Sequence, residues 1–335
     1  MRSWVRAIAA AISLLGPLTG RADLPPPGRP AAGPVAWQDS GPFAKLFLQL
    51  PFDAPEPVAC GVLEVSMRTL YSNSIARERV PGLSVDVSVE SAVPTIFARY
   101  GLPHGFELQL AIRGDVQYRG FLGRPIKVVE GLFGHVNPLR AGPPPGAAYF
   151  RVMRDDGFGL DWSGDAGSAG DPWIGVKRRV RGQHGWAPAM SWRIALEVPT
   201  TPLPFGSGLF EVGTGLIAGS TLGATSLSLE ADVMIPEGGQ FTAARLGTRP
   251  HFTVQLGVAR RVTRWLTGML QASAHTSAIT GTGVNVLEGT TTYLLAGFGV
   301  EPTRRTSVVF AVVENVLHAA RGADISGVLE VGWRP

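Results

Sequence analysis

The sequence has little cysteine, little charge and no long hydrophobic run in its main part, and each shortage excludes a class of protein. Its one cysteine, Cys60, excludes a disulfide scaffold and a cysteine-rich zinc site. Charged residues make up 17% of the chain, against about 25% in ordinary soluble domains. The basic residues form no cluster of the kind that binds nucleic acid, so nucleic acid is not an expected partner. After residue 22 no apolar run approaches the length of a transmembrane helix.

Glycine and proline are abundant instead, with 43 and 27 residues in a chain of 335. Both residues break helix interiors, which excludes a helical bundle or a coiled coil. The chain is also 45% apolar, with a mean hydropathy of +0.15. That content is too high for a disordered protein. The composition therefore predicts a folded chain that is rich in turns and strands.

The N-terminus has the pattern of a bacterial secretory signal. Arg2 and Arg6 form a basic head, residues 7–15 are apolar, and Gly20 and Ala22 are the small residues of a cleavage site. We expect cleavage near Ala22. Residues 23–58 are predicted to be a Pro- and Gly-rich segment whose apolar stretch at 43–48 packs against another part of the protein. Residues 59–335 are predicted to form the main domain.

Apolar and polar residues alternate strictly in several segments of that domain. Leu83, Val85, Val87 and Val89 alternate with polar neighbours, and residues 106–113, 190–198 and 226–235 repeat the pattern. A period of two is typical of a β-strand with one apolar and one polar face. Such strands occur in a soluble β-sandwich, where the apolar face points inward, and in an outer-membrane barrel, where it meets lipid.

Strand length and loop length favour the barrel. Many segments continue for about ten residues, which a tilted strand needs to cross a bilayer. Short connections, such as residues 301–305 and 261–264, alternate with longer ones, such as 236–248 and 71–82. Short periplasmic turns and longer extracellular loops are typical of outer-membrane barrels. We therefore predict an all-β, antiparallel transmembrane barrel of about twelve strands, with ten or fourteen as alternatives, and one long extracellular loop at residues 115–169.

The barrel hypothesis assigns a set of charged side chains of both signs to the lumen. Such side chains either pair across the wall or line a water-filled passage. The set predicts a narrow or plugged channel for small solutes, or an envelope component without transport, and the pattern indicates no cofactor, metal site or catalytic residue. The predicted lumen residues are Glu64, Arg68, Asp86, Glu90, Glu107, Arg113, Lys177, Arg179, Arg193, Glu197, Glu230 and Asp232.

Glycine-rich segments carry a family resemblance. The segment from Phe121-Leu122-Gly123 through Val129-Glu130-Gly131 to Asn137-Pro138-Leu139-Arg140, preceded by long alternating strands, resembles a proteobacterial family of predicted outer-membrane β-barrel proteins of unknown function. Gly170-Asp171-Pro172-Trp173-Ile174-Gly175-Val176-Lys177 looks like a strand opening common in bacterial barrels. The resemblance implies an outer-membrane location and a barrel, and no activity. It also implies contact with outer-membrane lipid and lipopolysaccharide, and with the barrel-assembly machinery, for which Trp333 resembles a terminal aromatic signal.

Two other functions remain open at this point. The first is a soluble periplasmic β-sandwich or clam-like binding protein. The second is an outer-membrane hydrolase in which His275, on the polar side of its segment, pairs with a serine and an acidic residue.

Overall fold

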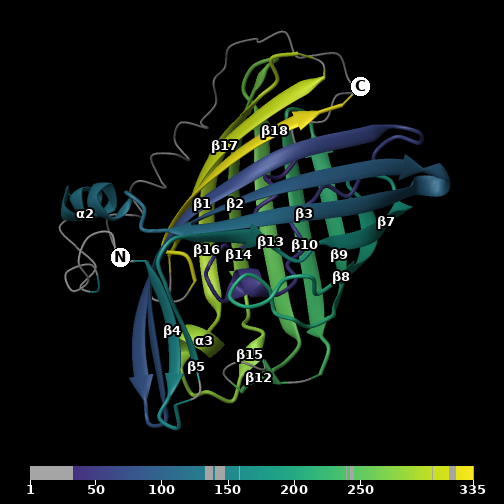
Figure 1. The fold of residues 1–335 in the computed structure, drawn as a ribbon. Helices are drawn as coiled ribbons and strands as arrows, with labels where there is room; N and C mark the ends of the chain where they lie inside the picture. The colour runs from purple at the N-terminus through teal and green to yellow at the C-terminus, as the bar shows by residue number, and fades with distance from the viewer. Residues whose placement is uncertain are drawn as a thin grey trace.

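The computed structural model describes residues 33–132, 139, 148–157, 159–238, 240–241, 245–303, 305–316 and 322–334. Its main feature is a closed barrel of twelve antiparallel strands (Figure 1). Each strand pairs with its neighbours, and β18 pairs back onto β1, so the sheet has no open edge. The predicted barrel and its strand number are confirmed, and the β-sandwich alternative is wrong. The predicted signal peptide lies outside the described residues.

The barrel strands follow the order β1, β2, β3, β7, β8, β9, β10, β13, β14, β16, β17 and β18. Their bounds are β1 Leu63–Val80, β2 Leu83–Leu102, β3 Phe106–Tyr118, β7 Trp173–Arg181, β8 Ala189–Glu197, β9 Glu211–Leu222, β10 Thr225–Pro236, β13 His251–Arg261, β14 Leu266–His275, β16 Thr291–Val300, β17 Thr306–Asn315 and β18 Ile325–Trp333.

Shorter elements extend or cover the barrel. β4 and β5 form a hairpin on β2, β6 pairs with β3, and β11, β12 and β15 form a small separate sheet. Their bounds, with the helices, are η1 Ala44–Leu46, η2 Pro103–Gly105, α2 Gly123–Leu132, β4 Tyr149–Arg154, β5 Gly159–Ser163, β6 Ala166–Ala169, β11 Gln240–Phe241, β12 Leu246–Thr248, β15 Ile279–Thr280 and α3 Asn285–Glu288. No helix within the described ranges is long and apolar enough to cross a membrane.

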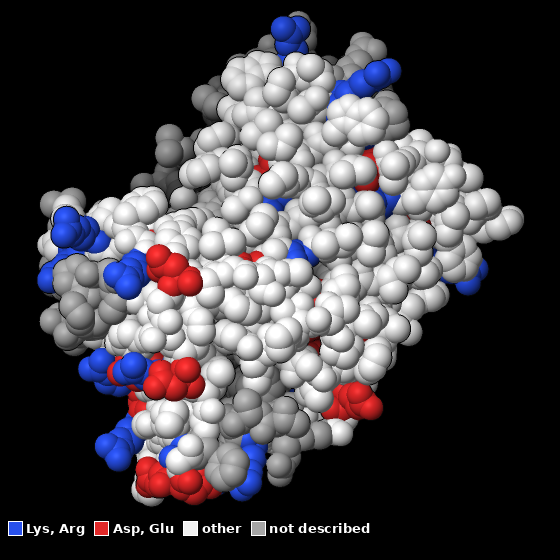
Figure 2. Space-filling view, in the orientation of Figure 1, with Lys and Arg blue, Asp and Glu red and all other residues white. Residues whose placement is uncertain are grey.

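The two faces of most barrel strands differ as the alternation predicts. Leu229, Leu256 and Ile194 point outward and are each about half exposed, whereas their neighbours Glu230 and Arg193 are buried inside. On the face shown in Figure 2, charged side chains gather near the ends of the molecule and leave a broad band with few charges. The outer wall is therefore largely apolar, and the interior holds the charge.

The two ends of the barrel also differ. At one end, which we call the short-turn end, brief turns join neighbouring strands, as at residues 223–224 and 262–265. At the other, the loop end, β1 and β2 continue past the end of β3, β4 pairs with β2 there, and β5 pairs with β4. The long connection predicted at residues 71–82 is thus wrong, because β1 runs to Val80 and turns within two residues.

The overhanging part of β2 gives a second correction. Val85, Val87 and Val89 were predicted to face lipid, but they are at most 2% exposed. They pack with Phe150 of β4 in a hydrophobic core at the loop end. The alternation is present as predicted, but protein rather than lipid covers its apolar side.

The stretch at residues 115–169 is more structured than a loop. β3 continues to Tyr118, and the described part of the stretch then contains α2, β4, β5 and β6. None of these shorter strands adds to the twelve that close the barrel. On which side of a membrane this stretch lies remains a prediction.

Residues 33–58 occupy the inside of the barrel as a hairpin, which we call the lumen hairpin. Its first leg packs Val35 and Trp37 against Tyr293 of β16, and its second leg packs Leu48 and Leu50 against the opposite wall. Trp37, Leu48 and Leu50 are at most 2% exposed. Burial of a large apolar side chain contributes roughly 1.5–3 kcal/mol, so these contacts hold the hairpin firmly.

The tip and the ends of the lumen hairpin define its path. The tip, around η1, packs Phe43 and Phe47 into the core at the loop end. Just after the hairpin, the backbone of Cys60 forms an isolated β-bridge with Gly101, where β2 ends at the short-turn end. The hairpin therefore enters from the short-turn end, turns below the loop end and returns.

Glycines on the inner wall make room for the second leg. A Cβ atom at Gly257 would lie 2.8 Å from the Phe52 ring, and one at Gly219 would lie 3.1 Å from the Pro55 ring. Both distances are shorter than side chains normally allow, so a larger residue at either position would press on the hairpin.

Candidate functional site: the occupied lumen

The centre of the lumen is a buried charge network built around Asp53 of the lumen hairpin. The Asp53 carboxylate lies 2.7 Å from the Lys177 ammonium and 3.3 Å from the Arg99 guanidinium. Gln109 donates a hydrogen bond to the same carboxylate at 2.9 Å. Burial alone would raise the pKa of Asp53, but Lys177 and Arg99 bring it below its ordinary value. Asp53 is therefore a carboxylate clamped by two cations.

A second network on the neighbouring wall meets the same leg. Arg193 pairs with Glu230 at 2.6 Å and with Asp232 at 3.0 Å. It also donates to the carbonyl of Pro51 at 2.8 Å, while Glu230 accepts the N–H of Asp53 at 2.9 Å. Buried ions are costly unless each has a partner. Wall and hairpin here supply partners to each other.

Further predicted lumen residues lie inside the barrel. Arg68 is fully buried, donates to Gln38 of the hairpin and lies 4.6 Å above the Phe97 ring. Glu107 lies 3.1 Å from Lys177. Glu64 pairs with Arg99 at 3.0 Å nearer the short-turn end.

Arg113 and Glu197 face each other higher in the lumen, toward the loop end. Their charged groups are 3.9 Å apart, and Glu197 is almost fully buried. With the residues described above, they make a wall that carries both signs of charge.

Three predicted lumen residues lie elsewhere. Asp86 is on the outer face of the overhang, where it pairs with Arg77 at 3.2 Å, because the valines beside it turn inward. Glu90 is also on the outer face, and it is buried because it accepts hydrogen bonds from Tyr71 and from the N–H groups of Phe121 and Gly123 near the start of α2. The prediction for both residues is wrong.

Arg179 is the third. It points to the inner side of β7 beyond the enclosed part of the lumen, is about half exposed, and pairs with Glu56 at 3.1 Å. It therefore belongs to the rim of the short-turn end.

The sequence reasoning missed the hairpin residues that complete the site. Asp53 and Lys45 lie in a segment rich in proline and glycine, and Lys45 pairs with Asp115 at 2.6 Å in a buried contact near the tip. The available signal was the density of apolar residues between Phe43 and Phe52, which is unusual for an exposed linker.

The geometry around His275 does not match a hydrolase. Its Nδ1 lies 3.1 Å from the Thr253 hydroxyl, and its ring stacks edge-on against Trp37 and Tyr293. Within the described ranges no serine and no carboxylate hydrogen-bonds to this ring. The described residues include no group of three or more His, Cys, Asp or Glu that could hold a metal ion.

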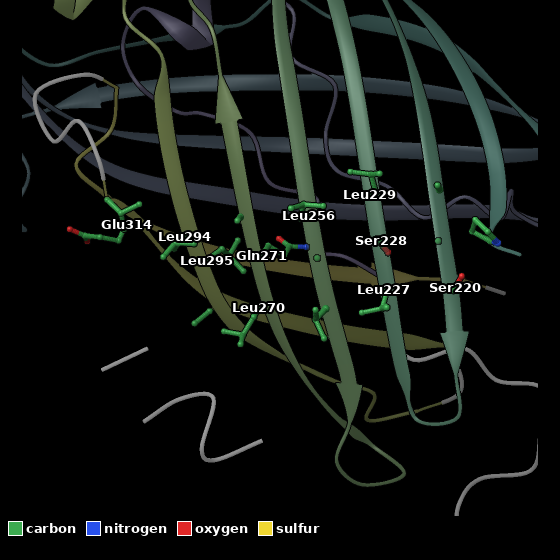
Figure 3. A pocket seen from close by; sticks show the side chains of 18 of the residues that line it. Ser220, Leu227, Ser228, Leu229, Leu256, Leu270, Gln271, Leu294, Leu295 and Glu314 are labelled. Carbon is green, nitrogen blue, oxygen red and sulfur yellow. The ribbon is translucent and has the colours of Figure 1, made fainter. Parts of the chain in front are cut away.

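The outer wall has one large apolar hollow, of about 830 Å³. Leucines on neighbouring strands line it, among them Leu229, Leu256 and Leu294 (Figure 3). Leu256 and Leu294 are paired with Ala272 on either side of it across the wall. Because the alanine side chain is small, the surface is recessed between the two leucines. The hollow belongs to the lipid-type face and is separate from the charged lumen.

The fold resembles outer-membrane barrels of known structure. A crystal structure of an outer membrane channel from Pseudomonas putida F1 aligns with a TM-score of 0.57 and 13% identity, over 84% of this chain and 97% of that one. A FadL homologue from Pseudomonas aeruginosa aligns at 0.41 and 9% identity, over 91% and 98%. The first likeness supports the barrel fold and nothing finer. No protein-family model matches the sequence, and no curated protein matches it.

Proposed function

We propose that this protein is an outer-membrane channel for small polar solutes and that the lumen hairpin closes it. The observation that carries the proposal is the interior itself: charged wall residues of both signs surround a piece of chain that is not part of the wall. A barrel of about eight strands is narrow enough to be filled by its own wall side chains, and a barrel of twelve strands is wider. Here Lys177, Arg193 and Glu230 contact the lumen hairpin, which fills the additional space.

The membrane location rests on the outer surface. The band of outward leucines, valines and isoleucines matches the face that a membrane barrel turns to lipid. Trp186, Trp265 and Trp333 are exposed near the short-turn end, as interfacial aromatic residues are in such barrels. We place this end in the periplasm, because short turns are typical of that side and the exported chain arrives there. The proposed proteobacterial family, lipopolysaccharide contact and assembly by the barrel machinery belong to the same proposal.

Conductance in planar lipid bilayers tests this function. The full chain is expected to conduct rarely, and a chain lacking residues 33–58 is expected to conduct steadily. Folding of the shortened chain is checked by the change in gel mobility between unboiled and boiled samples. If it does not fold, the full-length Asp53→Ala variant takes its place. A folded, unplugged barrel that carries no current would contradict the channel and favour an envelope component without transport.

A further inference from the structure

The polar contacts between the wall and the second leg of the lumen hairpin are mainly to the main chain of the leg. Wall carboxylates accept its N–H groups, and wall cations, a histidine and a hydroxyl contact its carbonyl groups. The N–H contacts are Leu48 to Glu211 at 3.0 Å, Asp53 to Glu230 at 2.9 Å and Val58 to Glu107 at 2.6 Å. The carbonyl contacts are Leu48 with His251 at 3.0 Å, Pro51 with Arg193 at 2.8 Å, Ala54 with Lys177 at 3.2 Å, and Pro55 with Ser191.

These contacts do not depend on the side chains of the leg. Every peptide has N–H and carbonyl groups in the same order, and an extended chain presents them at a regular spacing. The prolines at 51, 55 and 57 have no N–H, so they leave no donor in need of an acceptor, and they favour an extended backbone. The row of wall groups therefore matches an extended peptide as a class of ligand.

The wall recognises one side chain of the leg specifically, that of Asp53. Lys177, Arg99 and Gln109 converge on the Asp53 carboxylate from three different strands. A neutral residue at this point would leave the fully buried Lys177 with Glu107 as its remaining ion partner, and Arg99 with Glu64. Loss of a partner is costly for a buried cation. The wall thus selects for an acidic residue at the middle of the bound segment.

We propose that the inner wall is a binding track for extended peptides that carry an acidic side chain, and that residues 48–58 occupy it in the closed state. This inference rests on the proposed function, because the hairpin must leave before another peptide can enter. It names extended acidic peptides as the solute class of the channel.

The test measures binding of a fluorescent peptide with the sequence of residues 45–58 to the full-length protein in detergent, by fluorescence anisotropy. The protein carries Asp53→Ala, which weakens its own hairpin, together with Cys60→Ser and Ala54→Cys. Labelling of the cysteine at position 54 by a hydrophilic maleimide reports whether the hairpin has left the track. If it stays unreactive, Phe52→Ala, which removes a buried side chain of the hairpin and leaves the wall unchanged, replaces Asp53→Ala. An unreactive cysteine in both proteins would overturn the proposal, since the track would never be vacant.

Modified peptides distinguish main-chain recognition from non-specific binding. N-methylation at the positions of Leu48, Asp53 and Val58 removes the three donated N–H groups and is expected to weaken binding at least tenfold. N-methylation at the position of Glu56, an exposed residue whose N–H makes no hydrogen bond among the described residues, is the matched control and should change binding less than twofold. Exchanging each apolar side chain for another apolar one of similar volume, with the prolines and the aspartate kept, should also have little effect.

The result that would overturn the proposal is a vacant track that binds no peptide, or one that binds all the N-methylated peptides equally. Because anisotropy does not depend on current, the outcome is distinct from that of the conductance test. A barrel that conducts but does not bind peptide would leave the channel standing and remove only its solute class.

Discussion

The Lys177 ammonium lies 2.7 Å from the Asp53 carboxylate, although the two residues are 124 positions apart in the sequence. Lys177 belongs to the wall and Asp53 to the lumen hairpin. Lys177 is fully buried and Asp53 is 8% exposed. The pair therefore joins the lumen hairpin to the barrel wall at a place where water cannot replace a lost partner. The attachment of the hairpin is for this reason sensitive to single substitutions.

Asp53→Ala is expected to loosen the lumen hairpin strongly. It removes the carboxylate that the buried Lys177 shares with Arg99. Removal of one partner from a buried pair costs up to roughly 3–5 kcal/mol, and the cost here is smaller because Glu107 still pairs with Lys177. The measurement is the rate at which a hydrophilic maleimide labels Ala54→Cys in a Cys60→Ser background, which should rise at least tenfold. Glu56→Ala is the control, because its half-exposed pair with Arg179 contributes little. Equal labelling of the two variants would show that the pair does not hold the hairpin.

Gly257→Val is expected to loosen the hairpin by a steric route. Its Cβ would meet the Phe52 ring at 2.8 Å, and overpacking of this kind typically costs about 1–3 kcal/mol. The same labelling assay should show faster reaction at position 54. Phe52→Ala combined with Gly257→Val should then loosen the hairpin by less than the sum of the two single effects, because the clash disappears. Strictly additive effects would mean that the two residues do not touch.

Strand faces could be predicted from the sequence wherever the barrel wall has protein on one side and lipid on the other. On β8 and β10 the alternation correctly placed Arg193, Glu197, Glu230 and Asp232 inside, because a period of two fixes one face once the other is known. On β2 the same rule failed for Asp86. Alternation identifies an apolar face, but it does not tell whether lipid or a protein core covers that face.

The packing of the stretch at 43–48 could be predicted from its apolar residues, but the path of the whole hairpin could not, because its structure depends on distant partners. Residues 33–58 have no strand pattern, and their proline content indicates a linker. What orders them is contact with Glu107, Lys177, Arg193 and Glu230, which come together only when the barrel closes. The charged wall and the apolar stretch at 43–48 were visible in the sequence, but the contacts of Asp53 with the wall were not.

Cysteine labelling on whole cells is expected to distinguish the two ends of the barrel. Cys60 is exposed and lies at the short-turn end, so an impermeant maleimide should not reach it from outside. Gly157→Cys in a Cys60→Ser chain lies in the turn between β4 and β5, where nothing surrounds a new Cβ atom, and it should react readily. Both sites should react after the outer membrane is permeabilised. Labelling of Cys60 but not of position 157 on intact cells would mean that the orientation is the reverse.

The purified protein is expected to change mobility on gels when it is boiled. A closed barrel wall has no strand edge at which detergent or another chain can begin to separate the sheet, since β18 pairs with residues 65–73 of β1. The unboiled sample should therefore migrate as a compact species and the boiled sample as an unfolded chain. Asp86→Asn, in an exposed ion pair outside the barrel wall, should leave this shift unchanged. A protein that stays soluble without detergent and shows one mobility in both states would contradict a membrane barrel, because its exposed leucines would then have to be covered by something other than lipid.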